Sequence, residues 1–142
     1  MNRKNMLKLA HYLLGGRTKM RFDMEWFCDV APDQYECGTV ACAIGHGPAA
    51  GIALLEQEGW WEYAERALTT GFQETHWCFA YFWARVDNTP EGAAKRILWL
   101  LEYGVPKDWQ AQMLGSAPLC YLDIDTTPEA FRRLGVMEAD NV

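Results

Sequence analysis

The stretch "NTPEGAAKRILWLLEYG", residues 88–104, carries the signals that decide the fold. Thr89 stands where a helix N-cap is expected, because its hydroxyl can accept a hydrogen bond from a backbone amide that has no partner inside the helix. Pro90 follows at the first helical position, where its missing N–H costs nothing, and Glu91 favours the positive end of the helix dipole. Gly104 is a usual residue after a last helical turn. The stretch therefore predicts a helix that ends just before Gly104.

The same signals occur again in "TTPEAFRRLG", residues 126–135. Thr127, Pro128, Glu129 and Gly135 take the N-cap, first-position, first-turn and helix-end places. We interpret the two stretches as convergent helix signals rather than as a structural repeat. Another helix is predicted near the N-terminus, where apolar residues recur at a helical period: Met6, Leu9, Ala10, Leu13 and Leu14.

The remaining segments predict shorter elements. Residues 39–46 have helical character, and "GHGP" ends that helix because Pro48 disfavours helix at the residue before it. Residues 72–86 are so rich in aromatic side chains that periodicity does not distinguish helix from strand. The best extended candidate lies near residues 119–125. We expect a mainly α fold, a single compact domain over residues 1–142, built from several short helices with one short extended segment.

Composition and charge exclude several classes of protein. Half of the 142 residues are hydrophobic, which is ample for one core, and the formal net charge is -6. An acidic chain repels phosphate backbones, so direct nucleic-acid binding is disfavoured. No apolar run is long enough to span a membrane. Five cysteines without a secretion signal indicate a reducing, cytoplasmic location.

The stretch "ECGTVACAIGHG", residues 36–47, holds two cysteines and a histidine and leaves several interpretations open. Its small residues favour a closely packed helix in which Cys42 acts as a small hydrophobe. A second interpretation is a zinc site of Cys37, Cys42 and His46, with His76 or Cys78 as the fourth ligand, because thiolate and imidazole are suitable zinc ligands. A local disulfide is a third interpretation.

A catalytic thiol is the further alternative for this stretch. A cysteine at a helix N-terminus has its thiolate stabilised by the helix dipole. The letters "QYECG", residues 34–38, resemble the start of the catalytic helix in the peptidase domains of bacteriocin exporters. That resemblance implies a cysteine-dependent hydrolase in which Cys37 attacks, Gln34 assists the oxyanion, and His76 and Asp87 complete the site.

Three stretches together resemble a group of small uncharacterised proteins from phages and proteobacteria. These are "FDMEWF", "CGTVACAIGH" and "DNTPEGAAKRI", and the hallmark of the group is C-G-T-x-A-C. The resemblance implies a phage or bacterial accessory protein and carries no catalytic assignment.

The aromatic supply predicts a ligand-binding surface. Aromatic faces stack on planar groups, and arginine binds phosphate. Trp60 and Trp61 are adjacent, so both cannot easily point inward from one helix. We expect a non-enzymatic binding protein that counteracts host defence by capturing a host protein or a small nucleotide ligand, without a cofactor. The candidate binding residues are Trp60, Trp61, Trp77, Tyr81, Arg85 and Arg96.

Overall fold

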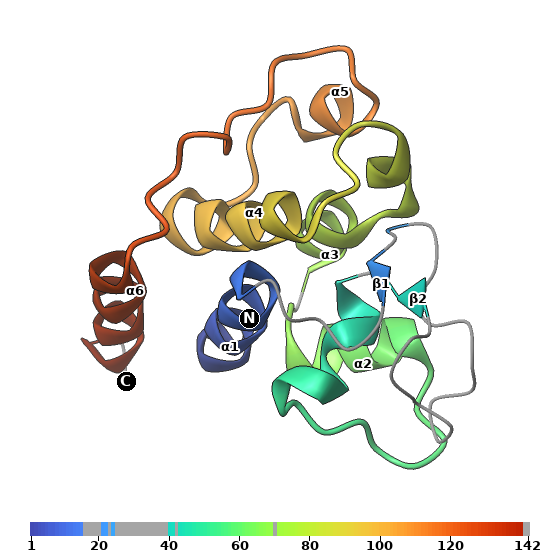
Figure 1. Ribbon diagram of the computed structural model, residues 1–142, viewed down its shortest axis with the longest axis vertical. Coiled ribbons are helices and arrows are strands. Elements are labelled where there is room, and N and C mark those ends of the chain that lie inside the picture. Colours follow the sequence, from blue (N-terminus) through green and yellow to red (C-terminus); the bar gives the residue numbers. More distant parts are fainter. Residues whose placement is uncertain (16–20, 23, 25–39, 42, 70, 141–142) are drawn as a thin grey trace.

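The computed structural model describes residues 1–15, 21, 22, 24, 40, 41, 43–69 and 71–140, and they form one mainly helical, compact domain (Figure 1). Its α-helices are α1 (Arg3–Leu14), α2 (Trp60–Ala67), α3 (Phe72–Phe79), α4 (Pro90–Tyr103), α5 (Trp109–Met113) and α6 (Pro128–Asp140). Short 3-10 helices are η2 (Ile44–His46), η3 (Pro48–Ala50) and η4 (Tyr81–Arg85). Two short strands, β1 (Arg21–Phe22) and β2 (Val40–Ala41), pair in parallel, with Arg21 opposite Val40.

Helix α4 begins and ends as its sequence predicts. The Thr89 hydroxyl accepts a hydrogen bond from the Gly92 amide at 2.9 Å, and Pro90 opens the helix. Gly104 follows the last turn with φ of 82°, a left-handed conformation that glycine adopts without steric cost. The face of α4 that packs inward includes Ala93, Ala94, Ile97 and Leu98, all fully buried.

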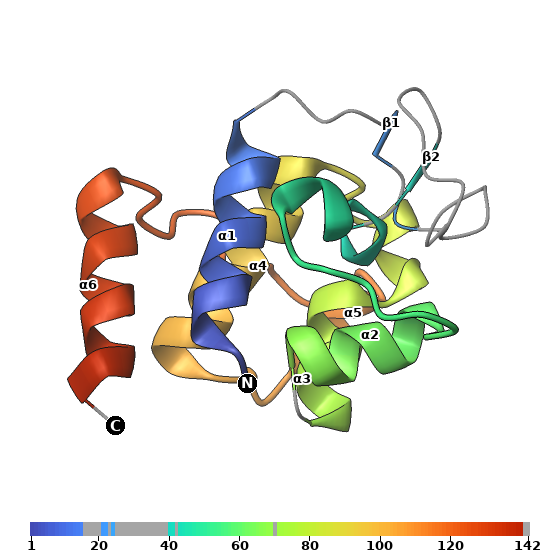
Figure 2. The same cartoon turned by 90° about the horizontal axis from the view of Figure 1, so that it is seen from below.

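Helix α1 lies directly against α4, and this contact forms the centre of the core. Met6, Leu9, Ala10 and Leu13 have no exposed surface, which confirms the helical stripe expected from the sequence. Both views of the ribbon show α1 beside α4, with α6 on the outer side of α1 (Figures 1 and 2). Within the described residues, no helix combines the length and the hydrophobicity needed to cross a bilayer.

The aromatic segment 72–86 is helical in two pieces, which settles the choice that periodicity left open. Helix α3 ends at Phe79, Ala80 is extended with φ of -65° and ψ of 148°, and η4 begins at Tyr81. The chain therefore turns a sharp corner at Ala80. Helix α3 packs on α4 and α5.

Two segments differ from the expected secondary structure. Of the residues in 39–46 that the structure describes, Val40–Ala41 pair as a strand and Ile44–His46 form a 3-10 turn. The β-branched side chain of Val40 and the poor helix propensity of Gly45 both work against a continuous α-helix there. The extended segment expected near 119–125 is mostly a turn, closed by the Ile124 amide on the Tyr121 carbonyl at 3.1 Å. No neighbouring strand is paired with it in the described sheet.

Helix α6 starts as predicted but runs past its expected end. The Ala130 amide donates to the Thr127 hydroxyl at 3.3 Å, as an N-cap requires. Gly135 was expected to end the helix, yet α6 continues to Asp140. A glycine inside a helix costs only about 1 kcal/mol relative to alanine, so one glycine does not by itself end a helix.

Replacing each of two helical glycines, Gly92 and Gly135, by alanine should change the stability of the protein in opposite directions. A Cβ at Gly92 would lie 2.0 Å from the Asp87 carboxylate, whereas a Cβ at Gly135 would meet only Leu7 Cδ1 at 3.8 Å. We expect Gly92→Ala to lower the thermal midpoint of unfolding by several degrees, because the carboxylate must move. Gly135→Ala is the matched control and should raise it, since alanine is the better helix former. Equal shifts in the two variants, measured by circular dichroism, would contradict the close approach at Gly92.

Candidate functional site

A fully buried arginine organises the interior beside η4. Arg96 has no exposed surface, and its guanidinium lies 4.1 Å from the centre of the Trp83 ring. Its Nε donates to the Cys78 carbonyl at 3.3 Å, and its Nη1 donates to the Tyr121 hydroxyl at 3.0 Å. Burial lowers the pKa of Arg96, while the neighbouring tyrosine and aspartate act in the opposite direction.

Asp87 supplies the negative charge that this arginine needs. Its Oδ2 accepts a hydrogen bond from the Tyr121 hydroxyl at 2.6 Å and lies 3.7 Å from Arg96 Nη1, and its Oδ1 accepts from Thr89 at 2.7 Å. Burial is the main cause that raises the pKa of Tyr121, so its hydroxyl stays protonated and donates. The set links α4, η4 and the turn at Tyr121 by charge and hydrogen bonds.

The structure therefore divides the six candidate binding residues. Trp77 and Arg96 are fully buried, so they belong to the core and not to a surface that meets a ligand. The expectation for these two is corrected because the buried network and the helix packing use their side chains. Of the other four, Trp60 and Trp61 are half-buried, and Tyr81 and Arg85 are exposed.

The two adjacent tryptophans point to different neighbours. Trp60 packs edge-on against Tyr63, with ring centres 5.7 Å apart, and Trp61 packs edge-on against His76 at 5.2 Å. Each is partly exposed at the start of α2. Trp61 is therefore the member of the pair that meets α3.

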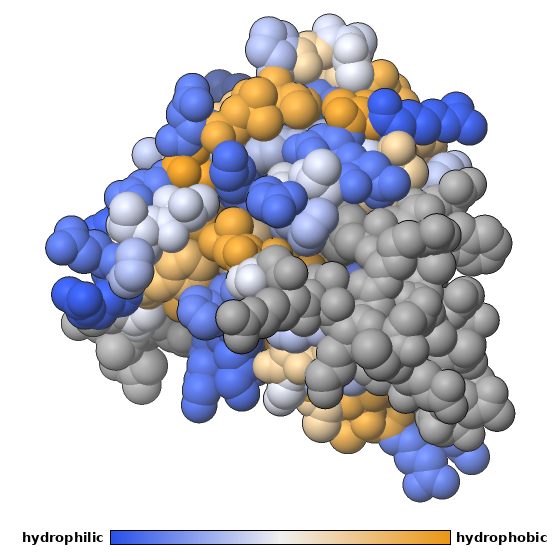
Figure 3. Space-filling view, viewed as in Figure 1, coloured by the Kyte–Doolittle hydropathy of each residue, from blue (hydrophilic) through white to orange (hydrophobic). Residues whose placement is uncertain are grey.

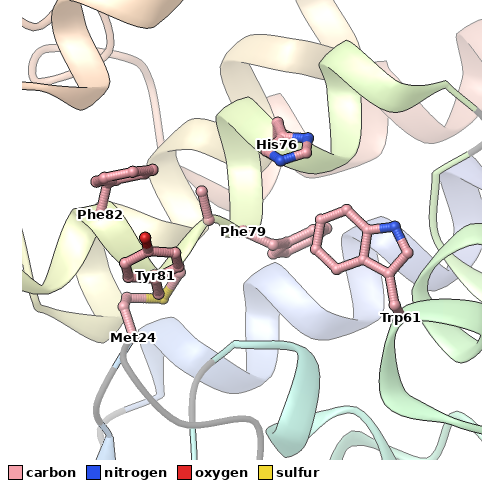
Figure 4. A pocket seen from close by; sticks show the side chains of 7 residues that line it. Met24, Trp61, His76, Phe79, Tyr81 and Phe82 are labelled. Carbon is pink, nitrogen blue, oxygen red and sulfur yellow. The ribbon is translucent and has the colours of Figure 1, made fainter.

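Trp61 helps to line an aromatic pocket at the corner between α3 and η4. The aromatic pocket has a volume of about 170 Å³, and its described lining comprises Met24, Trp61, His76, Phe79, Ala80, Tyr81 and Phe82. Figure 4 shows the rings of His76, Phe79, Trp61, Tyr81 and Phe82 around this space. Tyr81 is 60% exposed, so this part of the pocket wall lies at the protein surface.

The corner at Ala80 explains why these rings meet. His76 and Phe79 are three residues apart on α3, so they project from neighbouring positions of one helix. The extended Ala80 then redirects the chain, and Tyr81 and Phe82 follow in the first turn of η4. Met24 completes the wall, and its amide donates to the Asn88 side-chain oxygen at 2.7 Å.

His76 is the polar group of this pocket. Its ring lies 4.1 Å from the Phe72 ring centre and 6.4 Å from that of Trp109. Its Nδ1 is buried and has no hydrogen-bond partner. A buried polar atom without a partner costs free energy, so this nitrogen destabilises the fold locally. No described lining residue carries a carboxylate, a thiol or an ammonium group.

The residues named for hydrolysis and for zinc fall into separate places. Gln34, Cys37 and Cys42 lie outside the described residues. His76 stacks among aromatic rings, whereas Asp87 is engaged by Tyr121, Thr89 and Arg96, so the structure gives no hydrogen bond between His76 and Asp87. Cys78 is fully buried and its pKa is raised by burial.

His46 and its neighbours are packed in the interior. Ile44, Gly45 and His46 are all buried, and a Cβ at Gly47 would lie 2.2 Å from the Tyr63 hydroxyl. That hydroxyl donates to the Ile52 carbonyl at 2.6 Å. This part of the "ECGTVACAIGHG" stretch is closely packed. Across the part of the chain that the structure describes, no three metal-ligating side chains of His, Cys, Asp or Glu cluster together.

Sequence reasoning missed several residues of the aromatic pocket. Met24, Phe79 and Phe82 were not candidates, because nothing in a single sequence shows that the chain turns at Ala80. The dense aromatic run 72–86 was the available signal, and its correct division into helix, corner and 3-10 helix would have brought Phe79 and Phe82 forward. Comparison of this chain with protein-family models, with curated proteins and with solved structures finds no match.

Replacing either of the two charged residues in the buried network should destabilise the protein, but by different amounts. We expect Asp87→Ala to lower the free energy of unfolding by about 3–5 kcal/mol, because it leaves Arg96 buried without its counter-charge. Arg96→Met should cost less, since the Asp87 carboxylate keeps the Tyr121 and Thr89 hydroxyls and is partly exposed. Urea denaturation of both variants measures the difference. A larger loss in Arg96→Met would show that the arginine's packing on Trp83 outweighs the charge pairing.

Proposed function

We propose that this chain is a non-enzymatic binding protein of phage or bacterial accessory type, which captures its target by taking one ring into the aromatic pocket. The target is a host protein or a small nucleotide, and its capture counteracts host defence. The observation that carries the proposal is a pocket at the protein surface that is walled by aromatic rings. Ligand sites commonly combine an apolar wall with a few placed polar groups.

The dimensions of the aromatic pocket support binding of a single ring. An engineered protein cavity of about 150 Å³ holds benzene, and this pocket offers about 170 Å³. Aromatic rings at its wall favour edge-to-face or offset stacking with an entering ring. A drug-sized ligand needs more room, since typical ligand pockets span about 300–1,000 Å³.

The surroundings of the pocket provide further apolar contact. Phe72 is 66% exposed and its ring packs at a tilt on His76, and Tyr81 stacks on Phe82 with ring centres 4.4 Å apart. Exposed aromatic side chains grouped at one place are typical of interaction sites. Figure 3 shows a group of hydrophobic atoms at the end of the molecule that carries α5.

The non-enzymatic assignment rests on the chemistry of the pocket and on Asp87. The described lining offers no carboxylate or thiol for acid–base or nucleophilic work. The aspartate needed to orient His76 in a cysteine hydrolase is already engaged by Tyr121 and Arg96. Catalysis by Cys37 and zinc binding by Cys37, Cys42 and His46 stay predictions from the sequence.

Ring binding is tested with two simple probes, toluene and indole, by calorimetry and by saturation-transfer NMR. We expect both to bind, and Tyr81→Ala and Trp61→Ala to weaken binding about three- to tenfold each, the usual worth of an aromatic contact. Tyr103→Ala is the matched control, because Tyr103 is also an exposed aromatic residue, at 64%, but packs on Trp99 of α4. It should leave the affinity unchanged.

The proposed function fails if neither probe binds the folded protein. It also fails if all three variants weaken binding to the same extent, since the probes would then adhere to exposed aromatic side chains in general.

A further inference from the structure

A second pocket lies where α4, α6 and the chain between α5 and α6 meet. It has a volume of about 220 Å³, and its described lining shares no residue with that of the aromatic pocket. We call it the acidic pocket. The lining residues that decide its chemistry are Trp99, Glu102, Tyr103, Asp123, Asp125 and Arg133.

The lining of the acidic pocket carries an excess of negative charge. Two hydrogen bonds of 2.9 and 2.6 Å join the Arg133 guanidinium to the Glu102 carboxylate, so these two charges balance each other. Asp123 and Asp125 are both exposed and leave two negative charges in the described lining. A hydrogen bond from the Thr127 amide at 2.9 Å lowers the pKa of Asp125, which therefore stays ionised at neutral pH.

An ammonium group of the chain itself already binds beside this pocket. Lys95 lies one turn before Trp99 on α4, and its Nζ donates to the Leu122 carbonyl at 3.0 Å. Leu122 directly precedes Asp123, so this turn presents acceptors that suit an ammonium next to the lining. Lys95 is not among the lining residues, and its single charge does not balance both aspartates.

Two aromatic rings form the apolar part of the same lining. Trp99 and Tyr103 are four residues apart on α4, so they share one face of the helix, and their ring centres are 4.3 Å apart. The face of an aromatic ring attracts a cation, and the methylene groups of a long cationic side chain pack readily on apolar surface. A metal ion would use only the oxygen atoms of this lining, whereas an alkylammonium uses the carboxylates and the rings together.

We propose that the acidic pocket binds a primary alkylammonium ion, whose charged head is held by the carboxylates of Asp123 and Asp125 and whose methylene stem packs on Trp99 and Tyr103. An engineered cavity of about 150 Å³ holds benzene, so about 220 Å³ accommodates a four-carbon stem with its head. The ion belongs to a free amine or to a lysine side chain of another protein, since both present the same chemistry. Ring binding in the aromatic pocket is not required for it.

The first test varies the ligand. n-Butylammonium, butan-1-ol, Nα-acetyl-lysine amide and calcium are titrated into the protein, and binding is followed by the NMR signals of Trp99 and Tyr103. We expect n-butylammonium to bind about tenfold more tightly than butan-1-ol, which has the same stem without the charge. This difference should shrink as salt rises from about 50 mM to about 500 mM, since exposed charges are screened.

The two possible sources of the ion give different affinities. Nα-acetyl-lysine amide binding as tightly as n-butylammonium would identify a lysine side chain as the occupant. An affinity about tenfold weaker would identify a free amine, because the peptide group would then be excluded from the pocket.

The second test varies the charge of the protein. Asp123→Asn should weaken n-butylammonium about threefold, the usual worth of an exposed ion pair, and leave butan-1-ol unchanged. Asp125 is kept, because its carboxylate also accepts the Thr127 amide at the start of α6. Glu91→Gln is the matched control, an exposed carboxylate on the same helix about three turns before Tyr103. It should leave the affinity unchanged.

The third test varies the rings and separates the two pockets. Tyr103→Ala should weaken n-butylammonium and butan-1-ol about threefold each, because it removes a surface on which the stem packs, and should leave toluene binding unaffected. Tyr81→Ala should do the reverse, since Tyr81 lines only the aromatic pocket.

Three results would overturn the proposal. Equal affinities for n-butylammonium and butan-1-ol would show that the carboxylates do not select a cation. Equal losses in Asp123→Asn and Glu91→Gln would show a response to overall charge rather than to this pocket. Calcium that displaces n-butylammonium and binds equally well to Tyr103→Ala would show a metal site instead.

Discussion

The pairing of the buried Arg96 charge is the interaction on which the rest of this structure depends. A guanidinium with no exposed surface is costly to remove from water, and one carboxylate, one hydroxyl, one carbonyl and one indole face offset part of that cost, while Nη2 is buried without a hydrogen-bond partner. These groups come from α3, η4, the segment between η4 and α4, and the turn at Tyr121. Because each must be in place for the charge to be tolerated, the network fixes how those four segments meet.

The aromatic pocket is a consequence of that fixed arrangement. Arg96 contacts the Cys78 carbonyl near the end of α3 and the Trp83 ring in η4, so it holds both sides of the corner at Ala80. Four rings of the pocket lining, those of His76, Phe79, Tyr81 and Phe82, belong to the same two helices, and the fifth, Trp61, comes from α2. A rigid polar interior on one side thus supports an open apolar site on the other, a common division between the residues that position a site and those that meet its ligand.

The sequence predicted the elements whose signals are local and left open those that depend on distant partners. Thr89, Pro90 and Gly104 mark α4 correctly because capping acts within one turn of chain. The helix end predicted at Gly135 is wrong, because the small propensity cost of one glycine does not stop a helix. Val40–Ala41 forms a strand only because Arg21–Phe22 pairs with it, and no local pattern shows that partner.

The predicted binding residues also fall into two groups, those that line the aromatic pocket and those that are buried in the core. Trp61 and Tyr81 were identified from composition and adjacency, and they do line the aromatic pocket. Arg96 and Trp77 were chosen by the same reasoning and are buried, because a residue type alone does not show which face of a helix meets the core. Residues 34, 37 and 42 lie outside the described part of the chain.

The contact between α1 and α4 has a consequence for the order in which the chain acquires its structure. During synthesis, the apolar stripe of Met6, Leu9 and Leu13 leaves the ribosome long before Pro90–Tyr103, the helix that covers it. At about 10 residues per second the delay lasts several seconds. Throughout that interval the first helix presents an uncovered hydrophobic face, which is the kind of segment that chaperones hold. A nascent chain that ends before α4 therefore has no core to close, and premature termination there would yield an aggregation-prone fragment rather than a smaller folded protein.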